Sequence, residues 1–213
     1  LAATKATRMY MVYAHDDFYF CPNWDYYLYN EIKDLKSDMF YLSGTMINNG
    51  QIKFDCGNTI SDFDEEKLLS SLQTMKTMNF QGSTWAPMLI SKSLWDQVGG
   101  FSEEYFAGSG SDPDFNMKLW KIGVRVFKGL GNCRVYHFSS VSLRKKAWNN
   151  GAKTFLLKWG ISIKFFKKHY LKSNTIYNGP LTNPKKNYVY YYDLLKSKIS
   201  YCYLTLLKPF TKN

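Results

Sequence analysis

The chain has 213 residues, 45% of them hydrophobic and 18% aromatic, and this composition supports one folded domain with a sizeable core. Charged residues make up 21%, which excludes a disordered polyelectrolyte, and no apolar run approaches the roughly 20 residues that cross a bilayer. The sequence begins with Leu1 and has no signal-peptide pattern, so we expect a truncated or processed chain.

The formal net charge of +11 is concentrated in the last third of the chain. Residues 1–138 hold 13 Lys and Arg against 16 Asp and Glu, whereas residues 139–213 hold 15 against the single Asp193. This asymmetry predicts an anionic partner, which could be a membrane surface, nucleic acid or an anionic glycan. The four cysteines show no paired spacing, which favours reduced thiols in a cytosolic protein over a disulfide framework or a zinc site.

Alternating strands and helices are predicted over the first half of the chain. They are a buried strand at 8–14, a helix at 22–35, a strand at 39–47, a turn and return strand at 48–54, and a helix from Asp62 or Asp64 to about Met78.

The second half of the chain predicts a strand or extended edge at 84–90, a helix at 91–98 that Gly99 ends, a helix at 112–121, and strands at 124–127 and 133–138. The basic last third predicts helical segments over 147–170 with a break at Trp159-Gly160, a linker at 174–187, and a basic amphipathic helix at 188–207.

The cluster His15-Asp16-Asp17 lies between a predicted strand end and a predicted helix start, where open α/β sheets bind their ligands. Adjacent carboxylates repel each other and need a counter-charge, for which Mg²⁺ or Mn²⁺ is the usual ion. His137, at the end of another predicted strand, could add an imidazole nitrogen. The simpler interpretations are a helix-capping loop for the acidic pair and a structural role for His137.

Asp112 follows a Gly-Ser-Gly-Ser run at 108–111 and starts a predicted helix. It could be an N-cap that the helix dipole stabilises. Alternatively, it could be a general base aimed at an acceptor hydroxyl. Asp114, two residues later, fits a first-turn residue that the helix dipole favours.

The order of these features resembles family 2 glycosyltransferases with the GT-A fold. The matching pieces are YAHDDFYFCPNWD at 13–25, WAPMLISKSLWDQVGGFSEEYF at 85–106, SDPDFNMKLWKIGVRVF at 111–127 and VYHF at 135–138. The resemblance implies an α/β fold, a Rossmann-like mixed sheet flanked by helices, and a partial GT-A domain over 1–160. Residues 161–213 would form a basic, aromatic-rich helical extension. Only seven residues precede Arg8, so we expect the first nucleotide-binding βαβ part to be missing and nucleotide-sugar binding to be weak.

The resemblance also implies roles for individual residues. Asp17, Asp16 and His137 would bind the metal, and Asp112 would be the catalytic base. The residues implied to contact substrate are His15, Trp85, Gly99, Gly100, Ser111 and Asp114. Two of them depart from the family pattern, which usually has Asp at position 15 and Glu at position 111. Trp85 could stack on a sugar ring or belong to the core.

The implied function is metal-dependent, inverting transfer of a sugar from a nucleotide-diphosphate sugar to a glycan or lipid-linked acceptor hydroxyl, with Mn²⁺ or Mg²⁺ as cofactor. We expect a cytoplasmic protein whose residues 139–213 contact an anionic inner membrane face, although a solvated helical face explains the same charge. The alternative is a non-catalytic remnant that binds glycans or nucleic acid. Nucleic acid is disfavoured because the positive charge lies outside the acidic core and no recognised nucleic-acid motif is present.

Overall fold

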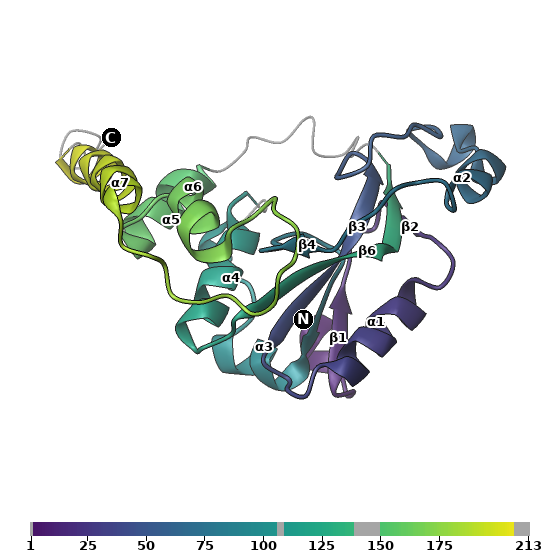
Figure 1. Ribbon diagram of the computed structural model, residues 1–213, viewed down its shortest axis with the longest axis horizontal. Helices are drawn as coiled ribbons and strands as arrows, with labels where there is room; N and C mark the ends of the chain where they lie inside the picture. Colours follow the sequence, from purple (N-terminus) through teal and green to yellow (C-terminus); the bar gives the residue numbers. More distant parts are fainter. Residues whose placement is uncertain (1, 106–108, 139–149, 207–213) are drawn as a thin grey trace.

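A curled mixed β-sheet with helices against both faces organises the chain, which is an α/β protein (Figure 1). The structure is a computed structural model, and it describes residues 2–105, 109–138 and 150–206. Its six strands are β1 (Tyr10–Tyr13), β2 (Phe18–Phe20), β3 (Phe40–Asn48), β4 (Phe80–Gln81), β5 (Met88–Ser91) and β6 (Val126–His137). They lie in the order β1-β5-β3-β6-β2, with β4 also paired to β6. Only the β3–β6 pairing is parallel.

The described α-helices are α1 (Trp24–Asp34), α2 (Glu65–Ser71), α3 (Lys92–Val98), α4 (Ser111–Lys121), α5 (Gly151–Trp159), α6 (Ile163–Phe165) and α7 (Tyr188–Leu206). Short 3₁₀ turns are η1 (Ala2–Lys5), η2 (Ile60–Asp62) and η3 (Glu103–Tyr105), and a π-helical turn, η5 (Phe166–Leu171), follows α6. The predicted break at Trp159-Gly160 is confirmed, because Gly160 ends α5 in a left-handed conformation. The predicted helix start at residue 147, the segment 139–149 of the basic third and residue 207 lie outside the described residues.

Strands β3 and β6 form the centre of the sheet. Neighbouring β3 residues face opposite sides, so Tyr41 packs with the α3–α4 layer while Phe40 and Leu42 pack with α1. The prediction of two strands at 124–127 and 133–138 is wrong, because β6 is one continuous strand. Glycines interrupt its apolar pattern: a Cβ on Gly131 would overlap the Met78 backbone, so close packing requires glycine there.

Strand β1 is confirmed as a strand, but the prediction that it is buried is wrong. Among the described residues it pairs only with β5, at the edge of the sheet, and its four residues are half-buried or exposed. The predicted return strand at 51–54 is reduced to a single bridge between Ile47 and Ile52. Strands β2 and β4 were not predicted, because each has at most three residues and no clear periodicity.

Local capping explains where two helices begin and end. Ser91 Oγ accepts a hydrogen bond from Leu94 N at the start of α3, and Gly99, with φ of 71°, ends this helix. Helix α2 starts after the predicted cap Asp64 but ends at Ser71, well before Met78. The carbonyls of Leu72 and Met75 accept hydrogen bonds from the Arg134 guanidinium in place of helical donors.

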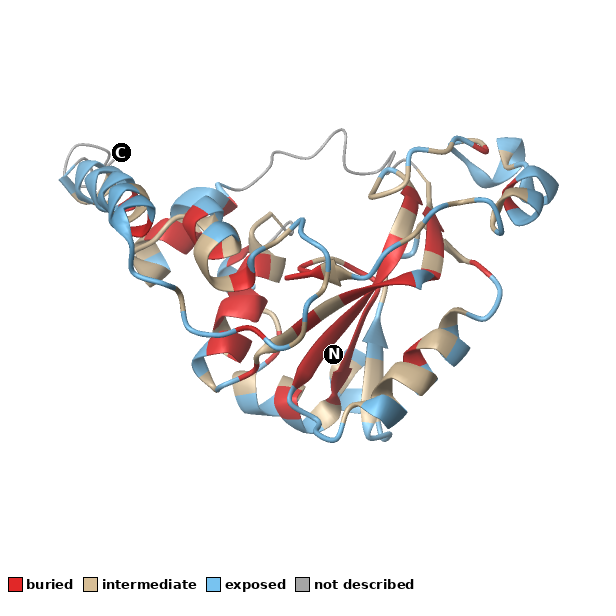
Figure 2. Cartoon of the chain, viewed as in Figure 1, coloured by how far each residue is buried: buried red, intermediate tan, exposed pale blue. Residues whose placement is uncertain are grey.

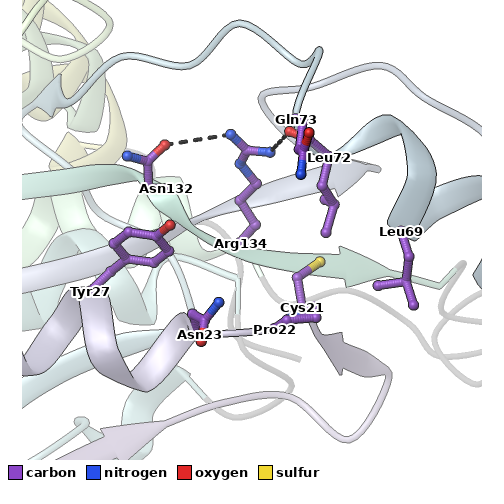
Figure 3. A pocket seen from close by; sticks show the side chains of 9 residues that line it. All are labelled: Cys21, Pro22, Asn23, Tyr27, Leu69, Leu72, Gln73, Asn132 and Arg134. Atoms are coloured by element: carbon purple, nitrogen blue, oxygen red, sulfur yellow. Dashed lines mark hydrogen bonds between the residues drawn. The ribbon is translucent and has the colours of Figure 1, made fainter.

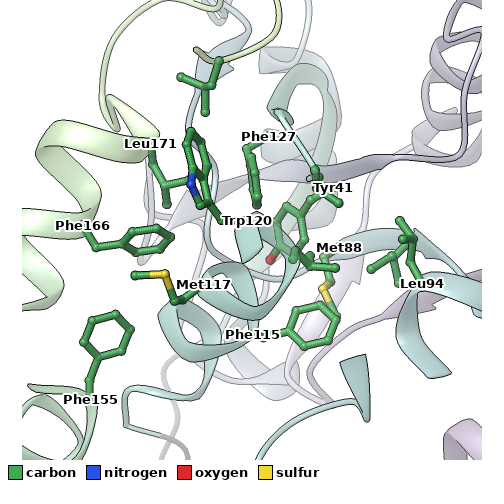
Figure 4. Packing of buried hydrophobic residues seen from close by; sticks show 14 of the residues in the cluster. Tyr41, Met88, Leu94, Phe115, Met117, Trp120, Phe127, Phe155, Phe166 and Leu171 are labelled. Carbon is green, nitrogen blue, oxygen red and sulfur yellow. The ribbon is translucent and has the colours of Figure 1, made fainter. Parts of the chain in front are cut away.

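The largest hydrophobic cluster joins the sheet to helices from both halves of the chain (Figure 4). Phe115 and Trp120 of α4 pack there with Phe127 of β6, and Phe166 and Leu171 of η5 belong to the same cluster. Residues beyond position 160 therefore share the core of the preceding residues. The predicted linker is also held in place, because Leu181 is buried and its N–H donates to the Arg125 carbonyl.

Candidate functional site

Three side chains that could hold a metal ion converge at one end of the sheet. One ligand atom from each of His15, Asp17 and His137 lies within 4.8 Å of the other two. His137 Nε2 is 3.3 Å from Asp17 Oδ2, and this buried nitrogen has no hydrogen-bond partner among the described residues. Two imidazoles and a carboxylate are chemically suited to a divalent cation, although such groups also occur without one.

Strand pairing brings Asp17 and His137 together although 120 positions separate them. Phe18 of β2 lies opposite His137 of β6, and Phe138 N donates to the Asp17 carbonyl at 3.0 Å. His137 Nδ1 lies 3.3 Å from the Asn49 carbonyl. If Nδ1 carries the proton and donates to that carbonyl, Nε2 is left with its lone pair toward Asp17, as a metal ligand requires.

His15 completes the group from the loop between β1 and β2. Its ring stacks on Phe18 with 4.9 Å between centroids and lies edge-on to Tyr13 at 5.6 Å. Burial lowers the pKa of His15, and His137 lowers it further, against the opposing effect of Asp17. A lowered pKa favours the neutral imidazole, which is the form that binds metals.

Asp16 does not belong to the convergent group. Like His15 it is exposed, but its carboxylate is not one of the three convergent ligand atoms. Of the three residues predicted as metal ligands, the structure thus brings together Asp17 and His137. The third convergent group is His15, which the sequence placed among the substrate contacts.

Asp112 lies in the first turn of α4, after the left-handed Gly110 that starts the helix. Burial raises its pKa from 3.8 to about 6, and the positive charge of Lys167 acts in the opposite direction. A carboxyl group with a pKa near neutrality can exchange protons with a substrate hydroxyl at physiological pH. Gly110 is the N-cap, so the capping interpretation of Asp112 does not hold.

Tyr13 lies at the end of β1, and the charges of two aspartates act on it. Burial raises the pKa of Tyr13, and the negative charges of Asp112 and Asp16 raise it further. Burial also raises the pKa of Tyr41 on β3, with a contribution from Asp112. The carboxylates of Asp112 and Asp16 therefore both act on the Tyr13 phenol, two residues before His15.

Asp114, one of the predicted substrate contacts, is enclosed by donors from other segments of the chain. Its side chain is 0% exposed, and its carboxylate accepts hydrogen bonds from Ser102 Oγ at 2.7 Å and Trp159 Nε1 at 2.7 Å. Lys158 Nζ lies 3.0 Å away, and Tyr105 also donates to it. A ligand could not reach this carboxylate without displacing these donors.

The remaining predicted substrate contacts lie in several places. Trp85 is half-buried, and its indole N–H donates to the Gly44 carbonyl at 2.8 Å, which ties it to β3. Lys118 Nζ donates to the Gly100 carbonyl, so the turn at Gly99 and Gly100 is anchored to α4. Ser111 is half-buried beside Asp112 at the start of the same helix.

A separate hollow of about 430 Å³ lies beside the start of α1 and the end of α2 (Figure 3). The Arg134 guanidinium lines it and donates to the carbonyls of Leu72 and Gly131 and to the Asn132 side chain. These hydrogen bonds to neutral acceptors fix the Arg134 guanidinium in place, so we assign Arg134 a structural role. Among the described residues that line this hollow, none is a predicted site residue.

Four residues around the site were missed by sequence reasoning: Tyr13, Tyr41, Asn49 and Lys167. Tyr13 could have been found, since it ends an apolar run directly before the acidic cluster. No sequence signal marks Lys167, because it is one of many lysines in the basic third. No protein-family model matches the chain, and a search of curated proteins finds no significant match.

Proposed function

We propose that this chain has the catalytic part of a metal-dependent, inverting glycosyltransferase of the GT-A type. One observation carries the proposal: the ligand atoms of His15, Asp17 and His137 converge, and the half-buried carboxylate of Asp112, whose charge acts on Tyr13 two residues before His15, has a pKa raised toward neutrality. This combination suits a reaction that needs both a divalent cation and a general base. The substrate class, a nucleotide-diphosphate sugar, rests on the ordered motifs of the sequence.

The donor set favours Mn²⁺ over Mg²⁺. Mg²⁺ prefers oxygen ligands and keeps several waters, whereas imidazole nitrogens suit transition metals. His15 therefore offers an imidazole where the family pattern has an acid, and an imidazole suits a transition metal better than Mg²⁺. When bound, such an ion would stabilise the negative charge of the departing diphosphate.

Asp112 is the proposed base. The acceptor hydroxyl gives its proton to the carboxylate as its oxygen bonds to the anomeric carbon, and the bond from that carbon to the diphosphate oxygen breaks. Attack from the opposite side inverts the configuration. Because the base must be ionised, we expect the transfer rate to rise as the pH increases through about 6.

The first experiment measures Mn²⁺ and Mg²⁺ binding by titration. We expect Mn²⁺ to bind more tightly, and Asp17→Asn or His137→Ala to weaken binding more than about tenfold, since even residues that merely support ligands have effects of that size. Asp16→Asn is the matched control, because it removes the neighbouring charge but none of the convergent ligand atoms. Equal losses in Asp16→Asn and Asp17→Asn would contradict the assignment.

A second measurement tests the reaction itself. The protein is incubated with Mn²⁺, UDP- and GDP-sugars and glycan or lipid-linked acceptors, and release of the nucleoside diphosphate is followed. Asp112→Asn should retain Mn²⁺ binding and lose transfer by about 10²- to 10⁴-fold. Transfer that survives this substitution unchanged would exclude Asp112 as the base.

A further inference from the structure

Helix α7 is largely exposed (Figure 2), and it presents an apolar side to solvent. At 100° per residue, six exposed residues fall within an arc of about 80°. We call them the α7 stripe: Tyr188, Tyr192, Leu195, Ile199, Tyr203 and Leu206. Their exposed fractions range from 48% at Tyr192 to 81% at Tyr188. Tyr190 and Ser197, on the opposite side of the helix, are buried.

Polar groups of α7 face inward instead. Ser197 Oγ accepts from Ser162 N at 3.2 Å, which links α7 to the start of α6. Asp193 accepts from Lys168 Nζ at 2.6 Å and lies 2.9 Å from His169 Nε2. A surface helix normally keeps its apolar residues against the core, whereas α7 has them on both sides: Tyr190 and the half-buried Leu194 and Leu204 face inward, and the stripe faces solvent. A continuous exposed apolar stripe of this kind marks an interaction surface.

Lysines flank the stripe. Lys196 and Lys198 are exposed on its two sides. Lys164 and Lys168 line a hollow of about 140 Å³ together with Lys196 and Asp193. An adjoining hollow of about 690 Å³ is lined by four lysines: Lys164 of α6, Lys167 and Lys168 of η5, and Lys172 directly after η5. Asp193 is the single acid among residues 139–213, so the surface beside the stripe is strongly cationic.

These features identify the kind of partner. A second copy of the chain would bring lysine-flanked stripes together with no matching acids, and the stripe is shorter than the three to four heptads typical of a coiled coil. An apolar stripe of tyrosine and leucine between lysines is the composition of a helix that lies in a membrane interface. Among the described residues, no helix is long and apolar enough to cross a bilayer.

We propose that the α7 stripe and the adjoining lysines dock the chain on an anionic lipid surface. The stripe enters the interface between headgroups and acyl chains, and the lysines contact headgroup phosphates. The proposal rests on the stripe and on Lys164, Lys196 and Lys198, and it uses neither the metal ligands nor Asp112 and Lys167, so it stands or falls independently of the proposed function.

The test is co-sedimentation with vesicles of phosphatidylcholine alone or mixed in equal parts with phosphatidylglycerol, without added metal. We expect binding to the anionic vesicles only. The double variant Leu195→Gln/Ile199→Gln should lower binding about tenfold or more. Its control is Ile60→Gln, because Ile60 is 88% exposed and lies outside α7.

Lys164→Gln/Lys196→Gln should lower binding about fivefold per lysine, while Lys53→Gln/Lys76→Gln removes the same charge elsewhere and should have a smaller effect. All altered residues are exposed, and circular dichroism of each variant verifies the fold. Equal binding to neutral vesicles, or equal losses in each variant and its control, would overturn the proposal. Dimers that form through the stripe without vesicle binding would assign the surface to a second copy and overturn it as well.

Discussion

Two carboxylates in the same turn of α4 have opposite environments. Asp112 is close to one positive charge, on Lys167, and burial raises its pKa to about 6. Asp114 is more deeply buried, yet four donors surround it, among them Lys158 and Trp159. Burial therefore destabilises the ionised form of Asp112, whereas the hydrogen bonds and the ion pair of Asp114 offset the cost of burying its charge. A charge held in an unfavourable environment is typical of a functional group.

This contrast predicts opposite effects on stability. The folded pKa of Asp112 is raised, so its contribution to stability is present at low pH and is lost as the pH rises through about 6. Asp112→Asn should therefore raise the free energy of unfolding by about 2–3 kcal/mol at pH 7 and have little effect below pH 4. Asp114→Asn should lower it by about 2–3 kcal/mol, because it leaves Lys158 and the surrounding donors poorly paired. Chemical denaturation across this pH range measures both, and destabilisation by Asp112→Asn at pH 7 would contradict the assignment.

At the level of elements, a close crossing places the start of α4 against the start of α5. Gly110 has φ of 89°, and a Cβ on it would lie 3.0 Å from the Gly151 backbone. A Cβ on Gly151 would overlap the Ser109 carbonyl. Both glycines are therefore needed for the two helices to approach, and the approach positions the turn that carries Asp112.

Gly151→Ala should lower the free energy of unfolding by about 2–3 kcal/mol, because the added methyl must displace backbone. Gly99→Ala is the matched control: a methyl group on Gly99 would have no neighbour within 4 Å, so only the left-handed conformation opposes the change, at about 1 kcal/mol. Thermal unfolding of the two variants compares their losses of stability. Equal losses of stability would show that the backbone at the crossing of α4 and α5 can move to accommodate the added methyl group.

On the scale of the whole molecule, one core joins the predicted transferase domain to the predicted C-terminal extension. Phe166 is fully buried, and its ring centroid lies 6.0 Å from that of Phe155. Both belong to the cluster that contains Tyr41 of the central strand. Unfolding of the extension would thus expose apolar surface of the sheet layer.

Phe166→Ala should therefore lower the stability of the entire described chain by about 3–5 kcal/mol, with one cooperative transition in calorimetry. Ile176→Ala is the control, because Ile176 is 65% exposed and its loss should change stability by no more than about 0.5 kcal/mol. Two separate transitions, with only one shifted by Phe166→Ala, would show that the extension folds independently.

The sequence by itself determined features that depend on neighbouring residues. Helices α1, α3 and α4 lie where apolar spacing, Ser91 and the glycines at 99 and 123 predicted them. The order of the acidic loop, the Asp112 helix and the His137 strand was also readable, because each is a local pattern. Each signal alone fitted a structural role, and only the resemblance carried by their order predicted Asp17, Asp112 and His137 as site residues.

Only the tertiary structure decided how these pieces meet. Periodicity carries no information on strand partners, so it could not show that β6 is one strand along β3, or that β1 lies at the edge of the sheet. It also could not show that His15, and not Asp16, joins Asp17 and His137, or that Asp114 is enclosed by donors from 102–105 and α5. Burial and ligand geometry depend on segments far apart in the chain, and those contacts exist only once the sheet has formed.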